Sequence, residues 1–290
     1  MAIPRRLSSR QGRVALVDGI PFELPVVCAP SPALMAAFSI DASKAALLLP
    51  GTEISPLRLW NGRGLLMIVV IDYQQTTIGK YIEFSVGVAC THGQRPARSL
   101  LPAMLMKAFE TGQYVVDLPV SSEVSVKGGR GIWGMPKHQA NLDFQISEST
   151  VSSKYDLEGQ DAVEIEIDRP KSKRLPLEMA ATNYCAFRGM LMKSRIYFTG
   201  KAELRLVGKA SARLRIGTHP RVEQLKHLDI DPSPLMTAFI PEVRGTLDDH
   251  LEAWFLDYPK VPEQVPEGLE TVVGLGQSQT WLAPPRRSAP

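Results

Sequence analysis

The sequence of 290 residues has few cysteines, little excess charge and no long apolar run. Its three cysteines, Cys28, Cys90 and Cys185, are widely scattered, which excludes a disulfide framework and a paired metal-ligand spacing. A net charge of +3 excludes a strong electrostatic preference for nucleic acid or membrane. No apolar run reaches the roughly 18 residues that a membrane-spanning helix needs. We therefore expect reduced, buried thiols in a cytoplasmic protein without nucleic-acid or membrane partners.

The two ends of the chain differ in composition from its middle. Residues 1–14 are polar and basic and lack the apolar core of a secretory signal, while residues 259–290 are rich in proline. Such segments bury too little apolar surface to offset the entropy of ordering them, so both are predicted to be tails or arms that wrap a neighbouring subunit. Residues 15–258 are predicted to form a single domain with a sizeable core. A homo-oligomer is expected.

The hydrophobic periodicity is mostly that of strands. Residues 65–73 form a nearly unbroken apolar run, suited to a strand that is buried on both faces, and residues 81–88 alternate between apolar and mixed polar positions. Further strands are predicted at 114–120, 140–146, 162–167, 194–199 and 202–206, and helices at 41–49, 99–110 and 219–228. Many strands with few helices predict a mainly β fold: an antiparallel sheet closed into a barrel or cone, with a few peripheral helices.

One segment, residues 129–138, carries the pattern of a covalent catalyst. Lys137 follows Pro136, which fixes its own backbone, and three glycines precede the pair, so we expect a tight turn before a rigid point. Trp133 and Met135 supply apolar bulk that would remove water from an ammonium group. Only a neutral amine attacks a carbonyl, and burial lowers an ordinary lysine pKa of about 10.4 by up to about 3–5 units. The segment therefore predicts Schiff-base formation with a ketone on Lys137.

Two short motifs carry a resemblance to a known family. Gly129-Arg130, followed by Pro136-Lys137, resembles the G-R-E-x-x-x-x-P-K-K stretch of acetoacetate decarboxylases, in which the first lysine forms the imine. Upstream, Tyr81-Ile82-Glu83 resembles the family's Y-x-E, in which the glutamate lines the same pocket. The resemblance covers roughly residues 15–258, and it implies a barrel-like cone with Lys137 inside.

The chain departs from the family pattern at the positions that handle charge. His138 stands where the family has its second lysine, and Gly131 where it has the glutamate of G-R-E. The stretch around residues 19–22 contains no counterpart of the early arginine associated with the substrate carboxylate, and apolar residues 66–68 stand where a further acid is expected. These differences argue against acetoacetate itself more than against imine chemistry.

His138 has two interpretations. It is adjacent to Lys137, so it is a candidate for substrate binding, but side chains of adjacent residues in an extended segment point to opposite faces. An unperturbed histidine is also mostly neutral at pH 7, so it would provide little of the repulsion of a second lysine. The alternative is a structural histidine with its own partner.

The leading prediction is a lyase that acts on a keto acid, with decarboxylation favoured. Lys137 forms the imine, Glu83 transfers a proton or orients water, and Arg130 meets a substrate carboxylate or makes a structural ion pair. The other predicted substrate-binding residues are Tyr81, Trp133, Met135 and His138. No metal, flavin or nicotinamide cofactor is implied. The alternatives are a lysine-dependent aldolase, dehydratase or cyclase on a pyruvate-like substrate, and a catalytically silent barrel that binds a small apolar ligand.

Overall fold

The computed structural model describes residues 3–9, 12–93 and 109–258. The chain divides into two units, Met1–Asp257 and Tyr258–Pro290, and the fold below is that of the first. The helix predicted at 99–110 lies mostly outside the described residues.

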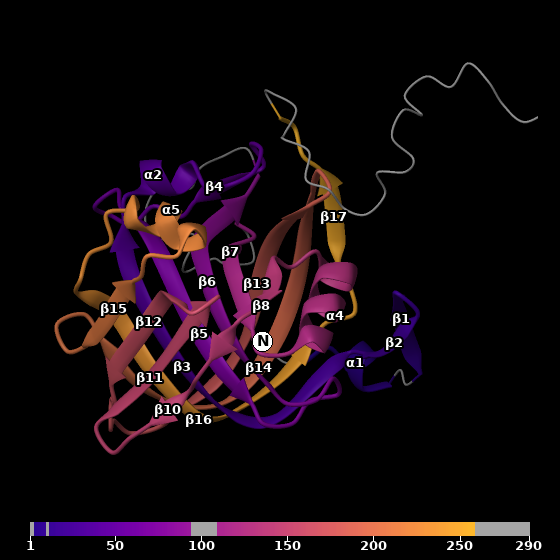
Figure 1. The fold of residues 1–290 in the computed structure, drawn as a ribbon, viewed down its shortest axis with the longest axis horizontal. Coiled ribbons are helices and arrows are strands. Elements are labelled where there is room, and N and C mark those ends of the chain that lie inside the picture. The colour runs from indigo at the N-terminus through magenta and orange to yellow at the C-terminus, as the bar shows by residue number, and fades with distance from the viewer. Residues whose placement is uncertain (1–2, 10–11, 94–108, 259–290) are drawn as a thin grey trace, which may run out of the picture. The chain divides into compact units, whose positions relative to one another are not determined.

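Seven strands form a closed barrel. Their order is β6-β5-β3-β16-β14-β13-β7, and β7 pairs again with β6, so the sheet has no open edge between its first and last strand. Most neighbours are antiparallel, whereas β7 and β13 are parallel. This architecture confirms the predicted β-barrel with few helices (Figure 1). The barrel strands are β3 (Val26–Ile40), β5 (Gly64–Tyr73), β6 (Tyr81–His92), β7 (Gly112–Val120), β13 (Leu175–Phe187), β14 (Met190–Leu206) and β16 (Pro234–Leu247).

Three short strands extend the barrel sheet at its margins, and two smaller sheets accompany it. The marginal strands are β4 (Ile54–Pro56), β8 (Lys137–Gln139) and β17 (Glu252–Phe255). The second sheet contains β9 (Asn141–Leu142), β10 (Gln145–Ile146), β11 (Thr150–Leu157), β12 (Gln160–Asp168) and β15 (Ala212–Ile216). The third is a hairpin of β1 (Arg13–Val17) and β2 (Ile20–Leu24).

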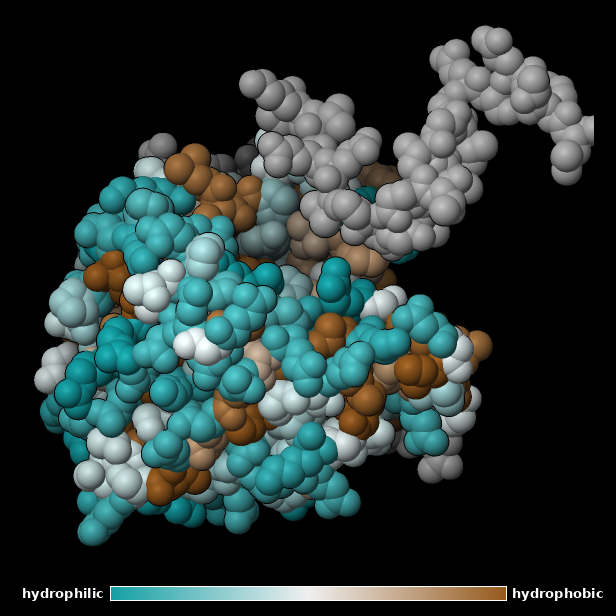
Figure 2. All heavy atoms as spheres, viewed as in Figure 1, coloured by the Kyte–Doolittle hydropathy of each residue, from teal (hydrophilic) through white to brown (hydrophobic). Residues whose placement is uncertain are grey.

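The second sheet packs on the outside of the barrel, on the left in Figure 1. Side chains of β5 and β6 form one buried core with those of β11 and β12, and the rings of Phe84 and Tyr155 meet edge to face at 5.1 Å. The face of the molecule that carries this sheet is mostly hydrophilic in Figure 2, with apolar residues scattered among polar ones. The apolar content of these strands therefore lies between the two sheets.

Successive side chains of β5 and β6 point alternately toward the second sheet and toward the barrel interior. In β5, Ile68 and Val70 pack toward the second sheet, whereas Met67 and Val69 point into the barrel. This two-sided burial explains the unbroken apolar run at 65–73. In β6, Glu83 and every second residue after it, including Ser85 and Ala89, point into the barrel. The closed sheet therefore encloses a partly polar face of this strand.

The helices are short and peripheral. α2 begins after Asp41, whose carboxylate accepts hydrogen bonds from the backbone N–H groups of Ser43 and Lys44, as expected for an N-cap. No helix among the described residues is long and apolar enough to span a membrane. The helices are α1 (Arg5–Ser9), α2 (Ala42–Ala46), α4 (Glu123–Trp133), α5 (Glu223–Lys226) and the 3-10 helix η1 (Pro220–Val222).

The N-terminal segment differs from the predicted tail of residues 1–14. It contains α1, and β1 begins at Arg13. Arg6 makes ion pairs with Asp248 and Asp249, and Arg13 also pairs with Asp249. The basic residues that indicated a tail or arm therefore hold this segment against Asp248 and Asp249, which follow β16.

Candidate active site

Lys137 is buried at the start of β8. Its side chain is only 5% exposed, and its Nζ lies 2.7 Å from Glu83 Oε2 and 2.9 Å from Ser125 Oγ. The ammonium also lies over the ring of Tyr81, 5.3 Å from its centroid. A buried charge is tolerated when it is paired and hydrogen-bonded, and these neighbours provide both conditions.

The strand order brings Lys137 and Glu83 together. Glu83 on β6 is paired with Val120 on β7, and Leu118 on β7 is paired with Lys137 on β8. Residues 118 and 120 of a strand point to the same face, so Glu83 and Lys137 lie on that face from either side of β7. Two residues that are 54 positions apart in the sequence thus form an ion pair inside the barrel.

The helix α4 supplies the third partner of this site. It begins after Ser122, whose hydroxyl accepts a hydrogen bond from the backbone N–H of Ser125, and it ends at Gly134, which has a left-handed φ of 63°. Gly129 and Gly131 lie within the helix, so the predicted tight turn is formed by Gly134 alone. The caps at both ends and the packing of the helix outweigh the low helix propensity of glycine.

Gly129 makes room for the reactive side chain. A Cβ atom at this position would lie 2.9 Å from Lys137 Cε. Ser125 and Gly129 are separated by four residues, so they lie one above the other on the buried face of α4. The aliphatic part of Lys137 therefore crosses the helix at a residue without a side chain, and its Nζ reaches the Ser125 hydroxyl.

Ser125 is the site residue that the sequence does not reveal. A serine in a polar stretch has no distinctive spacing, and only the helix geometry directs it at Lys137. Its hydroxyl also interacts with Tyr81, whose pKa is raised well above its ordinary value chiefly by burial and also by the charge of Glu83. Tyr81 therefore stays protonated at neutral pH and can donate a hydrogen bond at this site.

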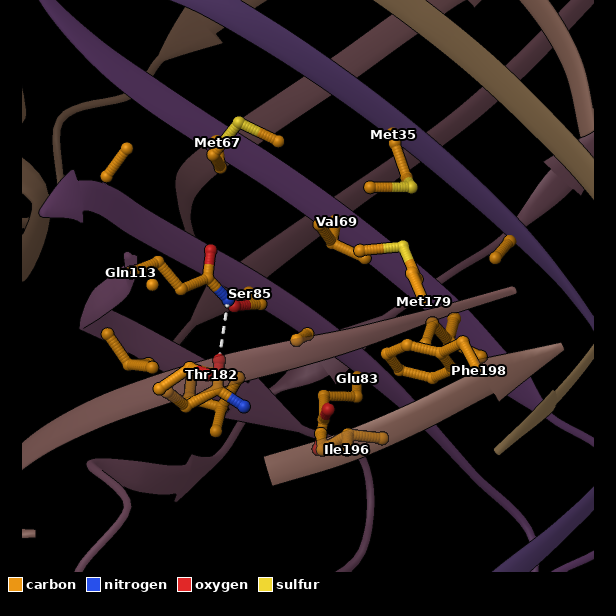
Figure 3. A pocket seen from close by; sticks show the side chains of 18 of the residues that line it. Met35, Met67, Val69, Glu83, Ser85, Gln113, Met179, Thr182, Ile196 and Phe198 are labelled. Carbon is orange, nitrogen blue, oxygen red and sulfur yellow. Dashed lines mark hydrogen bonds between the residues drawn. The ribbon is translucent and has the colours of Figure 1, made fainter. Parts of the chain in front are cut away.

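Two neighbouring spaces with shared wall residues lie at the site. A pocket of about 30 Å³ is lined by Lys137, Tyr81 and Cys28 together with other residues, and a cavity of about 260 Å³ extends along the barrel interior. Figure 3 shows the larger cavity, with Glu83 and Ser85 on its wall and Met35 and Met67 above them. Glu83 and Met135 line both spaces, so the large cavity lies on the other side of the Glu83 carboxylate that pairs with the Lys137 amine.

The other predicted site residues fall into two groups. Tyr81 and Met135 line the pocket with Lys137. Trp133 is buried in a neighbouring core, where its Nε1 donates a hydrogen bond to the backbone oxygen of Asp248 at 3.1 Å, and it lines neither space. Arg130 is exposed on the outer face of α4 and lines neither space. The helix thus turns Arg130 away from Lys137.

His138 points to the opposite face of β8, as the structural interpretation predicts. Its Nε2 lies 2.9 Å from Asp117 Oδ1, and the same carboxylate accepts hydrogen bonds from Arg221 Nε at 2.8 Å and from the Tyr155 hydroxyl at 2.7 Å. Burial alone would raise the pKa of Asp117, but the hydrogen bonds and charges of His138 and Arg221 outweigh it and lower that pKa. This network ties β8 to the second sheet behind the active site.

The three cysteines are free thiols and all are buried. Within the described part of the chain, no three His, Cys, Asp or Glu side chains gather as a metal site would require. The residues around Lys137 therefore offer an amine, a carboxylate, four hydroxyl groups and a thiol, which suit proton transfer and nucleophilic attack on a carbonyl.

Solved structures with this fold include an acetoacetate decarboxylase from Legionella pneumophila, with 16% identity and a TM-score of 0.57 over 77% of this chain and 85% of that one. A second structure described as acetoacetate decarboxylase has 14% identity and a TM-score of 0.61 over 81% and 91%. MppR, an enduracididine biosynthesis enzyme solved in complex with pyruvate, has 12% identity and a TM-score of 0.56 over 79% and 90%.

At these identities the likeness to solved structures concerns the fold alone. No curated protein matches the chain significantly in sequence. The sequence model of the acetoacetate decarboxylase (ADC) family, in contrast, matches residues 9–196, which include α4 and both residues of the Lys137–Glu83 pair. The chain belongs to the acetoacetate decarboxylase family.

Proposed function

We propose that this protein is an enzyme that forms an imine between Lys137 and the ketone of a small keto acid. The observation that carries this proposal is the position of Lys137 Nζ, buried between Glu83 Oε2 and Ser125 Oγ, where Glu83 also lines an apolar cavity. A solvated surface lysine has no such surroundings. Membership of the acetoacetate decarboxylase family supports the same chemistry.

The reaction begins with proton transfer from the Lys137 ammonium to Glu83, which leaves a neutral amine. The amine nitrogen attacks the ketone carbon, the carbonyl oxygen leaves as water, and an iminium ion remains. The departing oxygen takes one proton from the amine nitrogen and a second from Glu83, which becomes a carboxylate again. Ser125 holds the nitrogen by a hydrogen bond throughout, so the amine stays directed at the pocket.

The iminium ion then accepts an electron pair from the adjacent carbon. In a 3-oxo acid the bond to the carboxylate breaks, CO2 leaves, and the pair forms an enamine that is protonated at carbon and hydrolysed by water. The substrate carboxylate would lie near Glu83 in a pocket with little water, and the loss of CO2 removes one of the two negative charges. This relief of repulsion favours decarboxylation.

A second reaction class has a specific observation in its favour. Among the described residues, Lys137 is the only basic side chain that lines either space, so no further cation is present to hold the carboxylate of a 3-oxo acid. The similar structure of MppR was solved with pyruvate. An aldol or condensation reaction, in which the iminium ion of a pyruvate-like acid loses a proton and the enamine attacks an aldehyde, uses the same Lys137 and Glu83.

Product analysis separates the two classes. The protein is incubated with a panel of 3-oxo acids, and separately with pyruvate and an aldehyde, while CO2 release and carbon–carbon bond formation are measured. Decarboxylation predicts CO2 from the 3-oxo acids that disappears in Lys137→Gln. A condensation product from pyruvate without CO2 from any 3-oxo acid would assign the second class. If neither product forms in folded protein, the catalytically silent barrel replaces both.

A further inference from the structure

The interior of the barrel is much larger than a four-carbon acid requires. A cavity of about 260 Å³ runs along β3, β5, β6, β13 and β14. Its apolar wall includes Met35, Met67, Val69, Met179, Leu177 and Phe198. Figure 3 shows most of these side chains directed into the same space from different strands. Because methionine is flexible and polarisable, a wall of this kind adapts to a flexible apolar chain.

The cavity adjoins the pocket of the reactive amine. Tyr73, Glu83 and Met135 line both the cavity and the Lys137 pocket, and so do Ile196 and Phe198. A ketone carbon bound to Lys137 Nζ therefore has one substituent in the small pocket of about 30 Å³ and space for a long substituent in the cavity. The small pocket suits the carboxyl-bearing side of a substrate, since it is the more polar of the two and contains Tyr81.

The charges of the cavity disfavour an anionic tail. None of the described residues that line it is Lys, Arg or His, and its one ionisable acid is Glu83 at the reactive end. The amides of Gln113 and Asn183 bond to each other at 2.9 Å, shown by the dashed line in Figure 3. An anionic tail would be buried there without a cationic partner, which is unfavourable, whereas a hydrocarbon tail would lose only its contact with water.

The size of the cavity indicates the length of the tail. An apolar protein cavity of about 150 Å³ holds benzene, so by the same proportion the 260 Å³ here holds about ten carbon atoms. Acetoacetate has a single methyl group on the far side of its ketone. It would leave nearly all of this cavity unfilled.

We propose that the substrate is a 3-oxo acid whose ketone carries an unbranched aliphatic tail of about five to ten carbons, lying among Met35, Met67 and Met179. This inference rests on the proposed imine chemistry of Lys137. The ketone carbon binds Nζ, the carboxylate leaves as CO2, and the product released by hydrolysis is a methyl ketone that keeps the tail. Burial of the tail provides binding energy in place of an ion pair with the carboxylate, because no described basic residue other than Lys137 lines either space.

The first test compares acetoacetate, 3-oxooctanoate and 3-oxododecanoate as substrates of the full chain. We expect kcat/KM to rise at least about tenfold from acetoacetate to 3-oxooctanoate. Val69→Phe, which fills part of the cavity, should reduce kcat/KM for 3-oxooctanoate more than for acetoacetate. Val207→Phe is the matched control, because Val207 is 65% exposed, and it should behave as the native protein. Equal kcat/KM for the short and long acids would overturn the proposal.

A binding measurement keeps this test independent of the chemistry. Calorimetry with Lys137→Gln compares acetone with 2-nonanone, neither of which can form an imine there. Binding of 2-nonanone that is at least about tenfold tighter, and that Val69→Phe weakens, supports the tail site even if no acid is decarboxylated. Equal binding of the two ketones overturns it. Met179→Trp, on β13, replaces Val69→Phe if the latter does not fold.

Discussion

Gly129 of α4 lies so close to Lys137 that a Cβ atom on Gly129 would stand 2.9 Å from Lys137 Cε. The reactive side chain and the helix therefore fit together only because this position has no side chain. We expect Gly129→Ala to displace the amine from Glu83 and Ser125 and to slow imine formation by about 100-fold, since a shift of about 1 Å has effects of that size. The rate of adduct formation with a keto acid measures it.

Gly131→Ala is the matched control for this substitution. It adds the same methyl group to the same helix, but the new Cβ would meet Val17 Cγ1 of the β1–β2 hairpin at 2.5 Å and not Lys137. The control should lower thermal stability while the rate of adduct formation stays within a few-fold of native. Equal loss of rate in both variants would mean that the helix as a whole, and not the Gly129–Lys137 contact, is responsible.

Glu83→Gln tests the proton acceptor. Glutamine has nearly the same shape, but it cannot take the proton of the Lys137 ammonium, so we expect kcat to fall by about 10²–10⁴-fold. Glu164→Gln, on the solvent side of β12, is the control and should leave kcat unchanged. A Glu83→Gln enzyme with native kcat would remove Glu83 from the mechanism.

Asp117 makes the stability of the fold dependent on pH. Its pKa in the folded protein is lowered below an unfolded value of about 3.9, because His138 and Arg221 outweigh the effect of burial. The resulting stabilisation is fully present above that unfolded value and is lost as the pH falls through the folded pKa. Urea unfolding between pH 7 and pH 3 should therefore show decreasing stability in acid, with a smaller decrease in Asp117→Asn.

At neutral pH we expect Asp117→Asn to lower the free energy of unfolding by about 2–3 kcal/mol, less than for a fully buried ion pair because Arg221 is partly exposed. Asp161→Asn, at an exposed position of β12, should change it by less than about 0.5 kcal/mol. If the two variants lose the same stability, the buried network behind Lys137 contributes no more than a surface ion pair.

The buried thiols should be unreactive in the native protein. Burial chiefly raises the pKa of Cys28 to about 11, with a contribution from the charge of Glu83, and burial raises the pKa of Cys185 to about 12. At neutral pH almost no thiolate is present, so labelling with a thiol reagent should be slow until denaturant unfolds the chain. Rapid labelling of Cys28 in folded protein would show that the Lys137 pocket is open to solvent.

The sequence predicts the strands in which apolar and polar residues alternate regularly. It misses elements that contain glycine in the middle of a strand or helix. Residues 81–88 alternate because one face meets the second sheet and the other meets the barrel interior, and β6 follows that pattern. The predicted strands 194–199 and 202–206 are one strand, β14, because Gly200 lies within it at a register shift and does not form a turn. The predicted strand at 140–146 is instead divided between β9 and β10, each two residues long.

Only part of the site can be predicted from the sequence, because only some of its residues stand in a recognisable local pattern. Glu83 and Lys137 stand in short motifs, whereas Ser125 reaches Lys137 only through the turn of α4, a helix whose glycines predict no helix at all. The same helix exposes Arg130, which sequence proximity alone placed near the substrate. Tertiary packing decides these positions, and local sequence does not encode it.

The central claim, that Lys137 forms an imine, is tested most directly by borohydride trapping. The folded protein is incubated with a 3-oxo acid or its ketone product, reduced with borohydride and digested, and the peptides are analysed by mass spectrometry. Lys193 is an internal control in the same sample, because it is also buried, at 3% exposed, and paired with Glu110 and Glu252. We predict a reduced adduct on the peptide with Lys137 and none on the peptide with Lys193. An unmodified Lys137 across the whole panel, or equal modification of both lysines, would contradict the account.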